Sequence, residues 1–238
     1  LTNENMNSSV SLSRAMGLNF KQGQTWYDIM PPFIAYGLVN GLHLPLSMGM
    51  EVILVPDPNA VSIDRELLKY KPNHVTGTAN HWEDVANSPL AQSESFGFLL
   101  DPTCGGDNVA SSLEERINAF FNAHGSADKL RIGYGLTECC GGASIFPKAD
   151  QVVPQSVGLP FPNTVIAAFD TESGSPQELQ YAPENATAEG IATVSGEICI
   201  TGPHVMLGYY ENPAETEKVL AEHGGQVWLH TGDAGYIG

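Results

Sequence analysis

The chain has 238 residues, 42% hydrophobic and 16% charged. This composition supports a buried core in one large or two smaller domains and excludes a disordered chain. Ten lysines and arginines against 27 aspartates and glutamates give a net charge of −17, the wrong sign for a nucleic-acid binder or for a protein held on an anionic membrane surface.

The sequence shows neither a membrane span nor a disulfide framework. Its longest apolar-looking run, residues 33–55, is interrupted by Pro45 and by polar residues, and the polar start is unlike a signal peptide. The four cysteines form no C-x-x-C pair, which argues against zinc and for free thiols in a reducing compartment. We therefore expect a cytoplasmic protein without a transmembrane segment.

The first 146 residues alternate short apolar runs with helical patterns. Strands are predicted at residues 51–55, 73–77, 98–100 and 130–133, and the first of them is expected to be buried. Helices are predicted at 64–70, with Ser62 as the N-cap, and at 80–86. This alternation is typical of an α/β fold with an open, mostly parallel sheet.

The most regular helical pattern begins at Ser111. Ser111 and Glu114 have the spacing of a capping box, and Gly125 is suited to end the helix in the left-handed conformation. One apolar stripe recurs at helical spacing: Leu113, Ile117, Phe120 and Phe121. We therefore expect an amphipathic helix over this segment.

The pattern changes after about Pro147. Strands are predicted at 165–169, 196–201 and 227–229, and an exposed acidic loop at 171–190. One short helix is capped by Asn212, with Pro213 at its first position. We expect residues 1–155 to form an α/β subdomain and residues 156–238 a smaller, β-rich, distorted barrel-like subdomain.

The glycine-rich loop at 133–142, directly after a predicted strand, has the residue types of a phosphate site. Tyr134 offers a flat ring, the Thr137 hydroxyl can donate to a phosphate oxygen, and the Glu138 carboxylate suits Mg²⁺. Ligands of open α/β sheets bind at the carboxyl ends of strands. A plain glycine-rich turn remains the alternative.

Two further loops have similar properties. Asp233 lies in a predicted turn, where one carboxylate can accept hydrogen bonds from two neighbouring sugar hydroxyls. Gly105 and Gly106 follow the third predicted strand and permit close approach of a planar ring or a phosphate. Ordinary turns use the same residues, so each loop by itself leaves both interpretations open.

Together these segments resemble the adenylate-forming (AMP-binding) superfamily, and most of all its acyl-CoA synthetases. Residues 134–138 resemble the family motif Y-G-x-T-E, and residues 105–106 its upstream glycine pair. Residues 196–216 resemble G-E-[LI]-x-[IV]-x-G-P followed by G-Y-x-x-[NR]-P-x-x-T, and residues 228–233 resemble W-x-x-T-G-D. The segments stand in the family's order along nearly the whole chain.

The resemblance implies an ATP-dependent ligase that forms an acyl-adenylate from a carboxylic acid and passes the acyl group to a thiol, usually that of coenzyme A. By resemblance the nucleotide-binding residues are Gly105, Gly106, Asp107, Tyr134, Gly135, Leu136, Thr137 and Asp233. Thr137 and Glu138 are the implied catalytic residues, with Glu138 as the Mg²⁺ ligand. Ile34, Tyr36 and Gly37 are implied to line the acyl pocket, where Ile34 replaces a histidine or aromatic residue common in the family.

Two other interpretations stay open. An amino-acid-activating adenylation domain of a peptide synthetase would use a carrier protein as its thiol acceptor, and a non-catalytic nucleotide- or acyl-binding module would use none. The resemblance also implies an internal fragment of a large N-terminal domain, because the family's phosphate loop and its C-terminal domain are absent. We therefore expect the fragment itself to be inactive.

Overall fold

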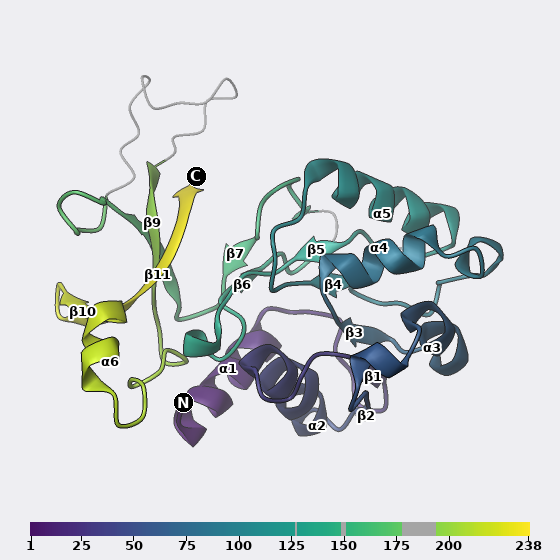
Figure 1. Ribbon diagram of the computed structural model, residues 1–238, viewed down its shortest axis with the longest axis horizontal. Coiled ribbons are helices and arrows are strands. Elements are labelled where there is room, and N and C mark those ends of the chain that lie inside the picture. The colour runs from purple at the N-terminus through teal and green to yellow at the C-terminus, as the bar shows by residue number, and fades with distance from the viewer. Residues whose placement is uncertain (127, 149–150, 178–193) are drawn as a thin grey trace.

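Two parallel sheets and an antiparallel sheet organise the chain (Figure 1). The computed structural model describes every residue except 127, 149–150 and 178–193. One parallel sheet has the order β2–β1–β3, formed by Glu51–Leu54, Thr25–Asp28 and His74–Thr76. The other pairs β4 (Thr103–Cys104) with β5 (Arg131–Ile132). The predicted α/β layer with a mostly parallel sheet is confirmed.

The central strand, β1, lies where the sequence pattern predicts no strand. Its residues Trp26, Tyr27 and Asp28 are buried and pair with β2 on one side and β3 on the other. Four residues are too few for a two-residue alternation to stand out. The edge position belongs instead to β2, where Glu51 and Leu54 are exposed, so the expectation of a buried strand at 51–55 is wrong.

Helices α3 (Ile63–Tyr70), α4 (Ala79–Asn87) and α5 (Ser111–Ala123) gather beside the parallel strands, on the right in Figure 1. The predicted stripe of α5 enters the core, where Phe121 packs edge-to-face on Trp82 of α4 with ring centroids 5.3 Å apart. Full burial of side chains of this size contributes about 1.5–3 kcal/mol each. Among the described residues, no helix has the length and apolar character needed to cross a bilayer.

The predicted strand at 98–100 is wrong. Leu99 is buried in the core, and strand β4 begins only at Thr103. The N-cap position of α3 is occupied by Ser62 as predicted, but its hydroxyl donates to the Asp64 carboxylate instead of accepting from a backbone N–H. The strand at 98–100 was mispredicted because a short apolar run fits several local structures equally well.

The capping box predicted for α5 is absent. Ala110 occupies the N-cap position, Ser111 is the first helical residue, and the helix has no side-chain cap. The Glu114 carboxylate is buried and accepts a hydrogen bond from the backbone N–H of Gln155 at 3.3 Å, a long-range contact that competes with the local cap. Gly125 has the expected left-handed φ of 80°.

The N-terminal part contains helices for which no pattern was identified. Helix α1 (Asn3–Ala15) begins with a capping box between Thr2 and Asn5. A π-helix, η1 (Tyr36–His43), continues directly into α2 (Leu44–Ser47). Because π-helices are rare and frequently occur at functional sites, η1 indicates a candidate functional site beside the parallel sheet. Short 3₁₀ turns occur at Pro58–Ala60, Ala91–Ser93 and Thr137–Cys139.

The antiparallel sheet has the order β10–β11–β9–β8 and stands apart from the parallel strands, on the left in Figure 1. Its strands are β8 (Val165–Phe169), β9 (Val194–Thr201), β10 (Leu220–His223) and β11 (Gln226–Ile237). A short antiparallel pair, β6 (Ser144–Ile145) and β7 (Leu159–Pro160), connects the two regions. The strand at 165–169 is confirmed, whereas β10 was not anticipated.

Helix α6 (Pro213–Val219) is confirmed, with the Asn212 side chain accepting from the backbone N–H of Glu215. Strand β11 continues well beyond the predicted 227–229 and changes register between His230 and Ala234. This irregularity turns residues 231–233 out of the ladder. The predicted loop at 171–190 lies largely outside the described residues, and the subdomain boundary at residue 155 stays a prediction.

Candidate functional site

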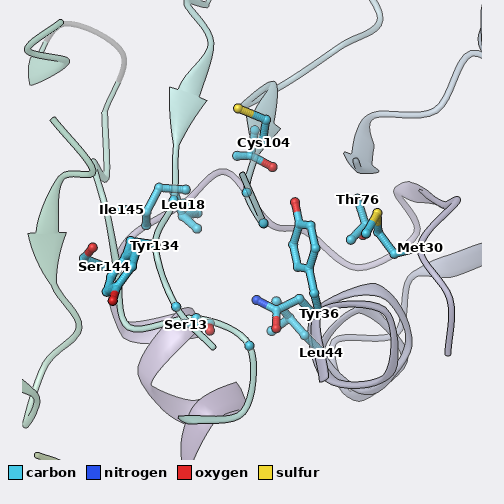
Figure 2. A pocket seen from close by; sticks show the side chains of 18 of the residues that line it. Ser13, Leu18, Met30, Tyr36, Leu44, Thr76, Cys104, Tyr134, Ser144 and Ile145 are labelled. Atoms are coloured by element: carbon cyan, nitrogen blue, oxygen red, sulfur yellow. The ribbon is translucent and has the colours of Figure 1, made fainter. Parts of the chain in front are cut away.

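A cavity of about 260 Å³ lies where the carboxyl ends of the parallel strands meet the π-helix (Figure 2). Segments following β1, β3, β4 and β5 all contribute to its wall. This edge is where open α/β sheets bind ligands. Eight of the residues named from the sequence line it: Ile34, Tyr36, Gly105, Gly106, Tyr134, Gly135, Leu136 and Thr137.

Two residues named from the sequence lie away from the cavity wall for clear structural reasons. Gly37 packs against the preceding loop, where an added Cβ would lie 2.8 Å from the Met30 carbonyl oxygen, so it serves close packing of η1 and does not line the cavity. Asp107 is exposed, and its Oδ1 accepts from the backbone N–H of Asn108 at 2.7 Å. Glu138 and Asp233 also lie outside the wall, where Glu138 directly follows the wall residue Thr137 and Asp233 accepts a hydrogen bond from the wall residue Tyr134.

A hydrogen bond joins two sequence motifs that lie 99 residues apart. The Tyr134 hydroxyl donates to Oδ2 of Asp233 at 2.6 Å. Burial and the Asp233 carboxylate both raise the pKa of Tyr134 above its usual value, so the phenol stays a neutral donor at physiological pH. Asp233 itself is exposed, which leaves lone pairs of its carboxylate available to a ligand.

The turn that presents Asp233 is fixed by its own backbone contacts. The Thr231 hydroxyl donates to the Ile198 carbonyl at 2.6 Å and accepts from the backbone N–H of Asp233 at 3.1 Å. The backbone N–H of Gly232 donates to Oε1 of Glu197 at 3.0 Å. The turn is therefore held from strand β9, so the Asp233 carboxylate has a defined position beside Tyr134.

A second hydrogen bond connects the 134–138 motif with the 208–213 segment. The Tyr209 hydroxyl donates to Oε1 of Glu138 at 2.8 Å, and this contact raises the pKa of Tyr209 to about 12. The backbone N–H of Met206 donates to the Glu138 carbonyl at 2.7 Å. Three segments that carry the family resemblance are thus in physical contact.

The glycine-rich loop folds back on itself at the cavity. The backbone N–H of Tyr134 donates to the Ser144 carbonyl at 3.1 Å, and the N–H of Ala143 donates to the Tyr134 carbonyl at 2.8 Å. An added Cβ at Gly135 would lie 2.8 Å from the Gly142 Cα. Only glycine fits such a close approach of backbone segments, and the approach holds the Tyr134 ring at the cavity wall, as Figure 2 shows.

Sequence motifs did not identify the more apolar part of the wall. Trp26 and His74 stack with ring centroids 5.0 Å apart, and Phe20 packs edge-to-face on both. The Trp26 indole N–H donates to the Thr76 hydroxyl at 2.5 Å, and burial lowers the pKa of His74 to about 4, so His74 is neutral at pH 7. These residues lie on β1 and β3 or just before them, in segments that carry no recognised motif.

The oxygen donors beside the cavity fit a magnesium ion. The Thr137 hydroxyl is exposed at the wall, and the adjacent Glu138 carboxylate is partly exposed with Oε1 held by Tyr209. Mg²⁺ prefers hard oxygen ligands and is commonly bound by one or two carboxylates together with substrate phosphates and waters. One carboxylate next to a hydroxyl is consistent with that pattern.

Comparison with known proteins identifies the family. The sequence model of the AMP-binding enzyme family matches residues 1–210. The long-chain-fatty-acid–CoA ligase of Bacillus subtilis (strain 168) is 28% identical over 242 residues, covering 100% of this chain and 39% of that protein. The chain therefore spans well under half the length of this relative.

Solved structures show the same fold. ATP-bound MatB from Rhodopseudomonas palustris has a TM-score of 0.80 at 20% identity, over 100% of this chain and 42% of that one. The McyG A-PCP structure complexed with phenylalanyl-adenylate has a TM-score of 0.80 at 18% identity, over 100% and 37%. With its matching sequence and its α/β and antiparallel sheets, this chain belongs to the AMP-binding enzyme family.

Proposed function

We propose that this chain carries the nucleotide- and acyl-binding part of an ATP-dependent ligase. The ligase converts a carboxylic acid into an acyl-adenylate with release of pyrophosphate and then into a thioester. The observation that carries the proposal is the shared wall of one cavity. Residues from the acyl segment, Ile34 and Tyr36, and from the nucleotide segments, Gly105 to Thr137, line the same space.

Each residue then has a role that follows from its position. The Tyr134 ring packs on the adenine, and Asp233, held by the Tyr134 hydroxyl, accepts hydrogen bonds from the ribose hydroxyls. The glycine pair at 105–106 permits close approach of the base, and Thr137 donates to the α-phosphate. Ile34 contacts the acyl chain. Such positioning holds the carboxylate in line for attack on phosphorus.

Glu138 and Thr137 are the residues that would hold Mg²⁺. The ion supplies positive charge that offsets the phosphate oxygens, a contribution that matters in a chain with a net charge of −17. The Tyr209 hydroxyl donates to Oε1 of the Glu138 carboxylate and so fixes the position of that oxygen. The Thr137 hydroxyl adds a neutral hydrogen-bond donor for the phosphate oxygens.

Coenzyme A is the favoured thiol acceptor, because the Bacillus subtilis relative that matches the whole chain is a CoA ligase. A carrier protein, as in peptide-synthetase adenylation domains, is the second candidate, supported by the likeness to the McyG structure. The four free, buried cysteines fit a reducing compartment, and we place the reaction in the cytoplasm. Since the chain spans under half of such enzymes, we expect it alone to bind nucleotide without turnover.

AMP binding tests the proposed site. The wild-type chain should bind AMP weakly, and Asp233→Asn should weaken that binding about tenfold or more, because hydrogen bonds to a charged acceptor contribute about 1.5–3 kcal/mol. Tyr134→Phe should change the affinity far less, since it keeps the ring that packs on the adenine. Isothermal titration calorimetry of the three proteins measures these affinities.

A matched control separates the site from a general effect of charge. Asp84→Asn removes an equal charge from an exposed position on α4 and should leave AMP binding unchanged. If Asp233→Asn retains the wild-type affinity, Asp233 is a turn residue and the assignment of the ribose site is wrong. If the wild-type chain binds no AMP, the proposed nucleotide site is itself wrong.

A further inference from the structure

Three metal-ligating side chains meet on one face of the antiparallel sheet. Glu197 and Cys199 lie two residues apart on β9, and His230 is the cross-strand partner of Cys199 on β11. Because side chains two residues apart share a face of a strand, all three project to the same side of the sheet. Their ligand atoms lie within 4.8 Å of one another.

The donor geometry is close to that of a zinc site. Nδ1 of His230 lies 2.8 Å from Oε2 of Glu197 and 3.4 Å from Sγ of Cys199. Donor atoms around a tetrahedral zinc ion are about 3.3–3.7 Å apart, given bond lengths near 2.0–2.3 Å. The His230–Cys199 pair already has this spacing, whereas the His230–Glu197 pair is at hydrogen-bond distance and would separate around an ion.

The carboxylate is already oriented by a neighbouring group. Its Oε1 accepts from the backbone N–H of Gly232 at 3.0 Å, which leaves Oε2 directed at His230. Hydrogen bonds of this kind fix the ligands of metal sites. The His230 and Glu197 side chains are 17% and 27% exposed, so water can reach a fourth coordination position.

The charges also balance around a divalent ion. Cys199 is fully buried beside the imidazole of His230 and the carboxylate of Glu197. A bound Zn²⁺ displaces the thiol proton to solvent, and the imidazole proton moves from Nδ1 to Nε2. Thiolate and carboxylate then offset the two positive charges of the ion. An isolated thiolate in this position would remain uncompensated.

We propose that Glu197, Cys199 and His230 form a binding site for a zinc-class divalent ion, outside the wall of the nucleotide cavity. No sequence motif indicates this site, because Cys199 and His230 are 31 residues apart and belong to no C-x-x-C or H-x-x-H pattern. The affinity is expected in the micromolar range. This moderate affinity is expected because only three protein ligands are available. In addition, Nε2 of His230 is buried with no hydrogen-bond partner among the described residues, so no neighbouring group supports the imidazole as a ligand.

Zinc and cobalt titrations test the site. The chain, freed of metal by dialysis against a chelator, should bind one Zn²⁺ per molecule by calorimetry. Co²⁺ in place of Zn²⁺ should give a thiolate-to-cobalt charge-transfer band. Cys199→Ala should abolish the band and weaken Zn²⁺ binding at least tenfold. Glu197→Gln, which keeps the side-chain volume, should weaken Zn²⁺ binding as well, and a wild-type Zn²⁺ affinity in this variant would contradict the three-ligand site.

Two controls are matched to the ligands. Cys140→Ala removes another buried thiol, and His223→Gln removes a histidine whose ring lies 5.9 Å from that of His230. Both variants should keep the wild-type Zn²⁺ affinity and the cobalt band. The proposal is overturned if the wild-type chain shows no stoichiometric Zn²⁺ binding and no cobalt band, a result that needs no variant to fold. It is also overturned if Cys199→Ala binds both ions as the wild type does.

Discussion

Asp101→Asn should lower the free energy of unfolding by about 3 kcal/mol or more, because removing one partner of a buried ion pair leaves the other charge uncompensated. The Arg131 side chain is 1% exposed and pairs with Asp101, while Asp128 lies 3.9 Å away and is partly exposed. Burial lowers the pKa of Arg131 only to about 10, so the guanidinium stays charged at pH 7. Asparagine tolerates the left-handed φ of 53° at position 101, so the substitution removes the charge and one acceptor oxygen without adding backbone strain.

An exposed ion pair in the same chain provides the control. Arg116 and Glu83 pair with side chains 57% and 36% exposed, so Glu83→Gln should cost less than about 1 kcal/mol. Thermal unfolding measures the loss of stability in both variants, and a decrease of roughly 6–12 °C in the unfolding midpoint is expected for Asp101→Asn. Equal decreases for the two variants would show that burial of Arg131 adds nothing to the cost of losing its partner.

Asp28→Asn should make the protein progressively more stable than wild type as the pH rises from about 4 to 8. Asp28 is fully buried at the end of β1, and burial raises its pKa from 3.8 to about 7. Oδ1 accepts from the backbone N–H of Met30, whereas Oδ2 has no hydrogen-bond partner among the described residues. Gly41 of the π-helix packs directly on the carboxyl group.

The sign of this pH dependence of stability follows from proton linkage. Between pH 4 and 7 the unfolded chain has lost the Asp28 proton and the folded chain has kept it, so the wild type loses stability as the pH rises through this interval. The shift of about three pH units corresponds to about 4 kcal/mol. Denaturant unfolding of both proteins at pH 4, 6 and 8 measures the difference. A constant difference across these values would mean that Asp28 ionises as in the unfolded chain.

Local patterns predicted those elements whose signal lies within a few residues. The stripe of α5, the strand at 165–169 and the capped, proline-initiated α6 all form as expected. The central strand β1 was missed because its four residues pair on both sides with strands that are distant in sequence. The π-helix was missed because nothing in residues 36–43 distinguishes its hydrogen bonding from that of an α-helix.

The candidate site was likewise predictable from the sequence only in part. Motif resemblance pointed to Tyr134 and Asp233, and the structure brings their side chains together although they are 99 residues apart. It also pointed to Gly37, which the structure assigns to packing of the π-helix. The wall around Trp26 and His74 carries no motif, since an apolar surface can be formed by many residue combinations. This part of the cavity wall can be identified only from the packing of the folded chain.

The affinity of the chain for a fatty acyl-sulfamoyladenosine, compared with AMP, tests most directly the claim that one cavity holds both halves of an acyl-adenylate. Calorimetry should show the analogue binding at least tenfold more tightly, because burial of roughly 100 Å² of acyl surface contributes about 2.5 kcal/mol. Ile34→Trp, which fills the acyl side of the wall, should remove this gain and leave AMP binding unchanged. Equal affinities of the wild-type chain for the analogue and for AMP would contradict the shared cavity.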